Sequence, residues 1–305
     1  MLNIMKNEST NVVNISGILS QLDVEEKSTA DGRDYVSAKA VIKVDQEIGG
    51  KMVENEIPVR FFSMKMKSDN SGVSKIYTSI CDFKNKFTSL AALPDEDKSM
   101  ASKVVINSGH IEENIWIDPN SGEARTTWQI GSNFMNEPRG EFEEGAKFEL
   151  SGVVINKTRE QDVNGEDTGR LKIKFGVVRY NGRLDVIELI AASENAVNFI
   201  ENNWEDGDTV NVNGAVSFNQ TQKVWYEEQG FGEPIKRTKT ISRKELIVLG
   251  GSPSGLEEEL SFDSNDVKSA LGNRQARVEE MKQKANTKGK SQQSTKSAFN
   301  SNLGF

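Results

Sequence analysis

The sequence predicts a mainly β protein built from two five-stranded Greek-key barrels in tandem, followed by a flexible C-terminal tail. Three observations predict it. A strand–glycine–strand pattern occurs at residues 12–19 and again at 147–154, the same order of strands and one helix follows each copy, and the composition turns polar beyond Gly251. At 305 residues, the chain has room for two domains of ordinary size. We expect domains at residues 10–140 and 146–251, and an acidic, partly helical segment with a disordered polar tail at 252–305.

The first strand of each copy contains a glycine, Gly17 or Gly152. A glycine inside a strand permits the sharp bend that lets one strand serve both sheets of a small barrel. After a polar turn, a second alternating strand is expected at residues 35–44 in the first copy and 170–178 in the second.

A third strand, a helix and two more strands complete each copy. The third strands are expected at residues 56–66 and 183–191. Apolar residues then recur at three- and four-residue steps from Ile76 to Leu90, and more briefly at 196–204, which predicts a helix between strands three and four. The last two strands are expected at 104–109 and 125–132 in the first copy, and at 210–214 and 239–249 in the second.

Three strands, a helix and two strands is the order of the OB-fold, a five-stranded Greek-key barrel. We therefore predict two tandem OB-folds, each with its helix between strands three and four. The alternatives are two unrelated β-rich domains or one larger β-sandwich.

The inventory of reactive residues argues against an enzyme. The one cysteine, Cys81, excludes an internal disulfide and fits a reducing compartment, so the cytoplasm is expected. The one histidine, His110, has no partner spaced for metal binding or acid–base chemistry, and no phosphate-binding loop or nucleophile motif is present. We expect no catalytic residue, no metal and no cofactor. No apolar run is long enough to span a membrane.

Net charge is −8, but it is unevenly distributed. Residues 1–145 carry 16 Lys and Arg against 23 Asp and Glu, residues 146–251 carry 14 against 16, and the remainder carries 8 against 7. Binding to phosphates needs a local positive surface rather than a positive total, because charges act over about 10 Å.

The second copy has such a surface on its second strand. Arg170, Lys172 and Lys174 alternate with apolar residues, so they share one face of the strand. In an OB-fold this strand forms the floor of the binding groove, and Arg179, Tyr180 and Arg183 follow at its end. The alternative is an ordinary solvated face.

A long loop is expected between strands four and five of the second copy. It combines aromatic and basic residues, which are the groups that sequence-tolerant binding of single strands requires. The predicted contacts are Trp225, Tyr226, Phe231, Lys236, Arg237 and Lys239. The alternative is that Trp225 only packs across a hairpin.

The first copy offers fewer candidates. Lys39, Lys43 and Arg60 lie on predicted strand faces and are included as weaker nucleic-acid contacts. Trp116 and Trp128 are expected to face each other across a turn near residues 118–122 and to pack together.

With this pattern in hand, the chain resembles single-stranded-DNA-binding proteins, in particular the tandem-barrel kind encoded by tailed bacteriophages. The resemblance rests on the opening strand at residues 13–19 and on an acidic chain with a polar tail ending in Phe305. It implies binding and protection of single-stranded DNA in replication, recombination or repair. In bacterial members an acidic tail tip recruits replication and repair proteins. Here the last 20 residues contain no Asp or Glu, so the acidic residues 257–263 are the better candidate for docking such partners, with the tail as the alternative.

The leading hypothesis is therefore a non-enzymatic protein that binds single-stranded DNA with little sequence preference. The alternative is an assembly or adaptor protein of a virion or replication complex, whose barrels bind other proteins. RNA or oligosaccharide binding on the same fold is a third possibility.

Overall fold

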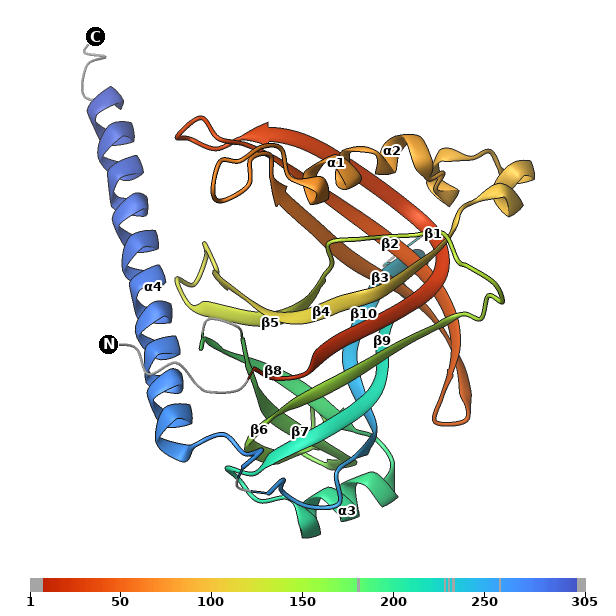
Figure 1. Cartoon of the computed structure of the whole chain (residues 1–305), viewed down its shortest axis with the longest axis vertical. Helices are drawn as coiled ribbons and strands as arrows, with labels where there is room; N and C mark the ends of the chain where they lie inside the picture. The colour runs from red at the N-terminus through yellow and green to blue at the C-terminus, as the bar shows by residue number, and fades with distance from the viewer. Residues whose placement is uncertain are drawn as a thin grey trace.

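Five strands form the first barrel of the computed structural model (Figure 1). β1 (Asn11–Ser28), β2 (Asp34–Ile48) and β3 (Lys51–Met64) pair antiparallel in sequence order. β4 (Lys103–Ile117) pairs with β1, and β5 (Ala124–Gly131) pairs with β4 and, in parallel, with β3. The structure describes residues 8–300 except 180–181, 228, 230, 232–233 and 258, and for residues 220–223, 239–241 and 286–300 it describes the backbone alone.

The second barrel repeats this order of pairing. Its strands are β6 (Gly145–Gln161), β7 (Asp167–Val178), β8 (Leu184–Ala191), β9 (Thr209–Glu227) and β10 (Ile235–Gly251). β6 pairs with both β7 and β9, and β8 pairs in parallel with β10. Helix α3 (Glu194–Asn203) lies between its third and fourth strands. The two barrels thus confirm the predicted tandem OB-folds.

Gly17 and Gly152 occupy the same position in β1 and β6. A Cβ atom on Gly17 would lie 2.3 Å from the carbonyl oxygen of Lys43, and one on Gly152 would lie 2.3 Å from that of Gly176. No side chain fits at this distance, so the bend of the first strand against the second requires glycine in both barrels.

The helical segment of the first barrel is broken into short pieces: α1 (Lys75–Cys81), α2 (Phe83–Lys86) and the 3-10 turns η1 (Leu90–Ala92) and η2 (Asp95–Met100). The Ser74 side chain accepts a hydrogen bond from the backbone of Tyr77 and caps α1. Phe87 continues the apolar spacing and is buried, but its backbone is extended. The single helix predicted from Ile76 to Leu90 is therefore wrong in extent, because burial of Phe87 does not need helical backbone.

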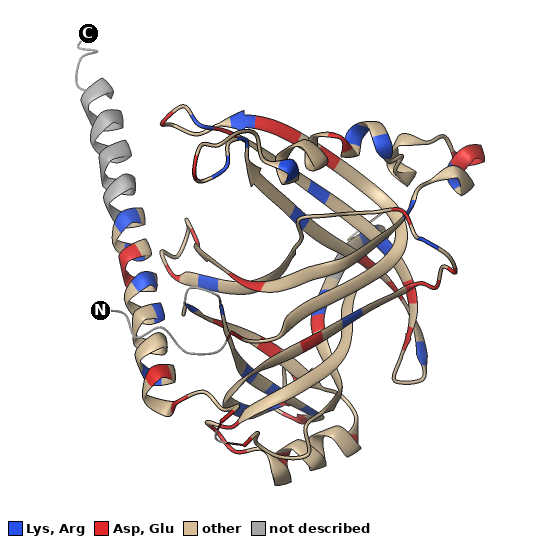
Figure 2. Ribbon diagram, viewed as in Figure 1, with Lys and Arg blue, Asp and Glu red and all other residues tan. Residues whose placement is uncertain are grey.

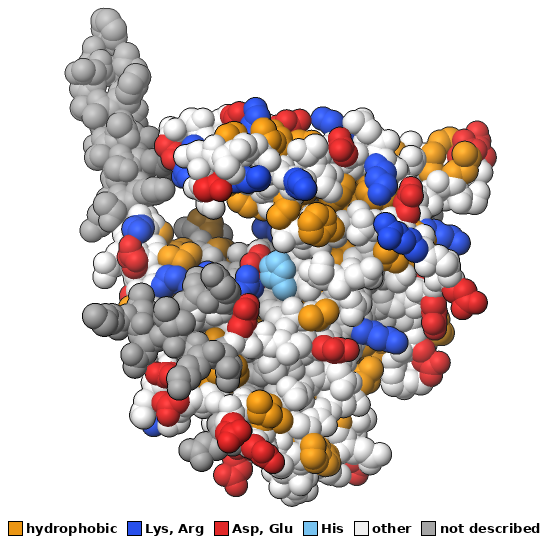
Figure 3. Space-filling model, viewed as in Figure 1, with side chains coloured by type: hydrophobic (Ala, Val, Ile, Leu, Met, Phe, Trp, Pro, Cys, Tyr) orange, Lys and Arg blue, Asp and Glu red, His pale blue; other side chains and the backbone are white. Residues whose placement is uncertain are grey.

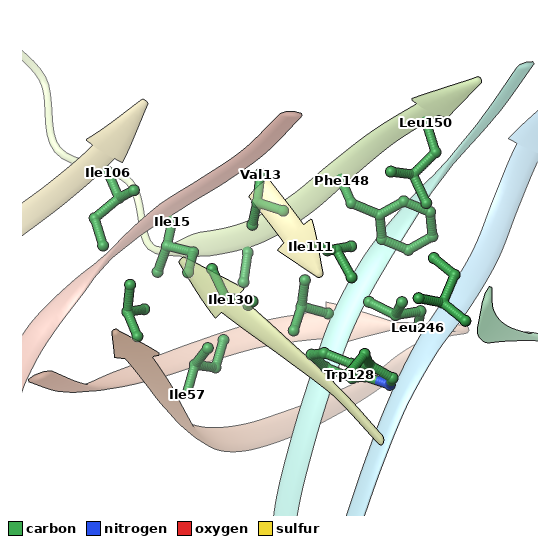
Figure 4. Close-up of a cluster of buried hydrophobic side chains, with 14 of the residues drawn as sticks. Val13, Ile15, Ile57, Ile106, Ile111, Trp128, Ile130, Phe148, Leu150 and Leu246 are labelled. Atoms are coloured by element: carbon green, nitrogen blue, oxygen red, sulfur yellow. The ribbon is translucent and has the colours of Figure 1, made fainter. Parts of the chain in front are cut away.

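The two barrels share one sheet and one core. β1 and β6 pair antiparallel from Asn11 opposite Leu150 to Ser16 opposite Gly145. Figure 4 shows apolar side chains of both barrels meeting in this region, among them Val13, Phe148 and Trp128. The barrels are consequently held by backbone hydrogen bonds as well as by apolar burial.

Polar side chains of the β2–β3 hairpin add to this joint. The Gln46 amide donates to the carbonyl of Val216 at 2.8 Å and accepts from the backbone nitrogen of Ala146 at 2.7 Å. The Asn55 side chain accepts from the backbone nitrogen of Phe218 at 2.8 Å. Because Gln46 and Asn55 are buried, these bonds orient the second barrel against the first.

The loop predicted between strands four and five of the second barrel is instead a two-stranded ribbon. β9 and β10 pair without interruption from Phe218 opposite Lys244 to Glu227 opposite Ile235. The error has a physical cause: polar residues mixed with aromatics are as compatible with an exposed ribbon as with a loop, since neither of its faces is fully buried.

The prediction for the two tryptophans of the first barrel is also wrong. Trp116 lies opposite Arg125 and Trp128 lies opposite Glu113, so the two rings are on opposite faces of the β4–β5 hairpin. Trp128 is buried in the core, whereas Trp116 is exposed.

The last element in the described part of the chain is a long helix, α4 (Ser264–Asn300), which lies along one side of both barrels (Figure 1). The predicted helix at residues 266–285 is present, and the helical backbone continues beyond it. Val267 and Ala270 pack against Val153, Val178 and Leu184 of the second barrel. None of the helices in the described part of the chain is long and apolar enough to cross a membrane.

Candidate nucleic-acid interface

The basic stripe of the second barrel is covered by carboxylates. Arg170 lies 3.1 Å from Glu160 and 2.7 Å from Glu245, and Lys172 lies 3.4 Å from Glu160. Arg243 contacts the same two carboxylates, at 3.6 and 2.7 Å. Arg170, Lys172 and Lys174 do alternate along β7, but only Lys174 is exposed and makes no ion pair within the described residues.

Burial outweighs these ion pairs at Glu245, whose pKa is raised mainly by desolvation and only partly lowered by Arg243. We interpret the Glu160–Glu245 cluster as a neutralised surface rather than a free positive one. Its acidic members come from β6 and β10, so inspection of β7 alone does not reveal them.

Arg179 and Arg183 lie at the turn after β7, where the two barrels meet. Arg183 is 2.8 Å from Asp185, and Arg179 is 3.6 Å from Asp185 and 3.8 Å from Glu112 of the first barrel. Tyr180 lies outside the described residues.

The β9–β10 ribbon presents most of the aromatic and basic residues predicted for it. Trp225, Tyr226 and Phe231 are 42%, 66% and 90% exposed. Lys236 lies opposite Tyr226, and Arg237 lies opposite Trp225 and within 2.8 Å of Glu227. Each exposed ring on β9 therefore has a basic residue beside it. The side chain of Lys239 lies outside the described residues.

A concave site is found on the first barrel instead. A groove of about 550 Å³ crosses all five of its strands. Lys39 on β2 and Arg60 on β3 are directly opposite each other in it, and both are exposed. Phe62 follows on the same face of β3, is 55% exposed and stacks at a tilt on Tyr35, with 5.4 Å between ring centroids. Lys43, the remaining candidate, is 3.2 Å from Glu54 and does not line the groove.

His110 lies in the floor of this groove and beside a hollow in the face shown in Figure 3. Burial, together with the charge of Arg179, lowers the pKa of His110 below its ordinary value of 6.5. At neutral pH it is therefore an uncharged ring that offers a stacking surface and hydrogen bonds.

The groove also contains acidic residues, namely Asp23, Glu25 and Glu112. Glu25 is paired with Lys27, Glu112 accepts a 2.6 Å hydrogen bond from Gln129, and Asp23 lies opposite Lys39. Figure 2 shows the same mixture over the rest of the molecule, with acidic and basic residues side by side on both barrels. The site therefore differs from a uniformly basic cleft.

The face that forms the groove continues along the β4–β5 hairpin. His110, Glu112, Asn114 and Trp116 alternate on β4, and Trp116 lies opposite Arg125 at the far end. Alternate residues of a strand share a face, so the exposed Trp116 and Arg125 lie on the same face as the groove residues of β4, beyond the groove itself. Phe62, His110, Trp116 and Arg125 were not among the contacts predicted from the sequence, although the alternation on β4 is a usable signal for His110 and Trp116.

Lys244, at the base of the β9–β10 ribbon, contacts the first barrel next to the groove. Its ammonium lies 4.1 Å from the centre of the Trp128 ring and donates to the Trp128 carbonyl. Burial and the nearby charge of Arg60 lower the pKa of Lys244 to about 8. The base of the ribbon is thus placed beside the Arg60 side of the first-barrel groove.

Residues 9–284 match the family model described as YorF. The chain belongs to the YorF family. None of the curated proteins compared with this YorF-family chain matches it.

Two solved structures of the single-stranded-DNA-binding protein from Thermus aquaticus are similar to the YorF-family chain. A deletion mutant is 14% identical with a TM-score of 0.48, and covers 82% of this chain and 97% of its own. The wild-type protein is 14% identical with a TM-score of 0.46, and covers 82% and 96%. The OB-fold assignment above rests on the strand pairing of this chain itself.

Among the described residues, no group of three or more His, Cys, Asp or Glu side chains is placed to hold a metal ion.

Proposed function

We propose that this protein binds single-stranded DNA with little sequence preference, through the first-barrel groove and the β9–β10 ribbon. The observation that carries the proposal is the continuous face from Lys39, Arg60 and Phe62 past His110 to Trp116 and Arg125. It places exposed cations next to exposed rings, which is the combination that binding of unpaired strands requires.

The chemistry follows from these groups. Lys39, Arg60 and Arg125 provide charge for backbone phosphates, while the rings of Phe62 and Trp116 stack on bases. Stacking contributes about 1–3 kcal/mol per base and accepts every base, because each has a π-face. Holding bases on rings keeps a strand unpaired, which supports a non-catalytic role in protecting DNA during replication, recombination or repair.

The first test is direct binding by the full chain. Oligo-dT of about 30 nucleotides, long enough for two OB-folds, is titrated at about 50 mM salt and followed by anisotropy and tryptophan fluorescence. We expect saturable binding that weakens with salt and quenches the fluorescence of Trp116 and Trp225. The proposal is lost if neither signal changes. Competition with oligo-U and with duplex DNA then decides between DNA, RNA and duplex preference.

A matched pair of variants locates the site. Each phosphate contact with a single strand adds about 0.7 to log K for every tenfold decrease of salt below about 1 M, so the loss of one contact weakens binding roughly eightfold at about 50 mM. The double variant Lys39→Gln, Arg60→Gln should therefore bind roughly 60-fold more weakly. The control Lys172→Gln, Lys174→Gln removes two cations from β7, the strand of the second barrel that corresponds to β2, and should change affinity by less than about fivefold. The reverse ranking would place the site on the second barrel.

An adaptor that binds proteins is the second candidate, and one observation favours it. The ribbon exposes apolar residues, including Phe231 and Val224, which a protein partner could cover. Residues 257–263 are a further candidate for docking, because Leu260 is exposed while Phe262 packs on the second barrel. An adaptor should be indifferent to both pairs of Lys and Arg substitutions.

A further inference from the structure

Helix α4 reaches from the second barrel to the first. Its apolar side packs on the second barrel through Val267 and Ala270. About one turn beyond Ala270, Arg274 makes a bidentate ion pair with Glu113 of β4, in the first barrel. The helix therefore covers the joint where the barrels meet.

Four guanidinium groups gather at this joint above two buried carboxylates. Glu113 and Asp185 have 0% and 1% of their side chains exposed. The partly exposed groups over them are the side chains of Arg179, Arg183, Arg274 and Arg277. Even with Glu112 counted, four positive charges face three negative ones. Because the two carboxylates lie underneath, the outer layer of this cluster is positive.

Two of these arginines have hydrogen-bonding capacity left. Nη2 of Arg277 is 3.7 Å from Glu113, beyond hydrogen-bond distance, and has no hydrogen-bond partner in the described part of the chain. Within the described residues, the Arg179 side chain makes one long hydrogen bond, 3.4 Å to the carbonyl of Ile111, and its carboxylate neighbours are 3.6 and 3.8 Å away. Nη2 of Arg277 is buried, whereas its side chain as a whole is 30% exposed, so an acceptor from outside meets this guanidinium at its exposed edge. Donors without partners are costly, so such an acceptor would be bound favourably.

The cluster adjoins the groove of the first barrel. Glu112 lines the groove and is also the carboxylate 3.8 Å from Arg179, and the charge of Arg179 reaches His110 in the groove floor. A chain of phosphates leaving the groove past Glu112 would meet the arginines next. Guanidinium groups bind phosphate oxygens through paired N–H donors.

We propose that Arg179 and Arg277 form a phosphate-binding site at the joint of the two barrels, and that α4 is therefore part of the nucleic-acid-binding surface. The site receives the backbone of a single strand as it passes from the first-barrel groove toward the second barrel. This inference rests on the proposed function and adds an element, α4, that lies outside both OB-folds.

The test compares Arg277→Gln with Lys268→Gln in the full chain, using oligo-dT of about 30 nucleotides. Both variants remove one positive charge from α4. Nine residues separate the two positions, which places them on opposite sides of the helix. We expect Arg277→Gln to bind roughly eightfold more weakly at about 50 mM salt, with a slope of log K against log salt that is shallower by about 0.7. Lys268→Gln should match the wild type in both.

A third variant, Arg277→Lys, separates binding from packing. It keeps the charge, so it should retain the wild-type salt slope, while hydrogen exchange shows whether α4 remains docked in all variants. Equal binding by Arg277→Gln and Lys268→Gln would overturn the inference, as would loss of α4 protection in Arg277→Gln that fully accounts for weaker binding. If the wild type itself fails to bind oligo-dT, the proposed function fails first, and the two outcomes are thereby distinguished.

Discussion

The two barrels have the same topology, but corresponding positions on their groove faces carry different chemistry. Counted from Gly17 and Gly152 along the paired strands, Lys39 corresponds to Lys172, and the residues opposite them are Arg60 and Ile190. On the fifth strands, the polar neutral Gln129 of the first barrel corresponds to Glu245 of the second.

These differences leave the two faces with different charge. In the first barrel Lys39 and Arg60 stay exposed beside a groove, whereas in the second barrel Glu160 and Glu245 neutralise Arg170 and Lys172. An OB-fold therefore provides a location for a groove, and the side chains of neighbouring strands decide whether that location is open and charged.

The largest expected effect concerns Glu113 on β4 of the first barrel. The corresponding residue of the second barrel is Phe218 on β9. Glu113→Gln leaves Arg274 with a weakened partner in a buried setting, so the docking of α4 should lose about 3–5 kcal/mol. Hydrogen exchange of the α4 amides at residues 264–281 measures this loss. Its control is Glu112→Gln, the next residue, which points into the groove and should leave α4 protection unchanged. Equal protection in both variants would show that the apolar contacts alone hold the helix.

The next prediction tests the contact between Trp128 and Lys244. These residues occupy corresponding positions of β5 and β10 and contact each other. Burial lowers the pKa of Lys244 from 10.5 to about 8. Between these pH values the unfolded chain binds the proton and the folded chain does not, so stability should rise with pH, by at most about 3 kcal/mol. Below pH 8 both states are protonated and this dependence vanishes.

Urea unfolding of the wild type and of Lys244→Met from pH 7 to 11 isolates the contribution of Lys244 to the free energy of unfolding, because the other titrating groups are common to both proteins. A wild-type curve that parallels the variant across this range would mean that Lys244 is not desolvated at the joint.

The prediction with the smallest expected effect compares the β4–β5 hairpin of the first barrel with the β9–β10 ribbon of the second. Trp116→Ala and Trp225→Ala should each weaken binding of oligo-dT by about 1–3 kcal/mol if both extensions stack on bases. Phe199→Ala on α3 removes a ring with the same 42% exposure but away from both surfaces, and should bind as the wild type does. Loss in only one of the tryptophan variants would assign stacking to that barrel alone.

Much of the architecture was predictable because it depends on local patterns. Strand alternation, the glycine at Gly17 and Gly152, and the return to strand after each helix are properties of short stretches of sequence, and they predicted both OB-folds. The segment from Phe218 to Ile235 was less predictable, because an exposed ribbon lacks the one-sided alternation that marks a half-buried strand.

The candidate site was predicted less well than the fold, for a physical reason. The sequence by itself determined the strand faces, so it placed Lys39 and Arg60, or Arg170 and Lys172, on the correct side of each strand. Only the tertiary structure decided which of these charges remain free, since the carboxylates that neutralise Arg170 come from strands ten residues before it and 75 residues after it. Charge–charge interactions act across neighbouring strands regardless of sequence separation, and the closure of the barrel sets which strands are neighbours.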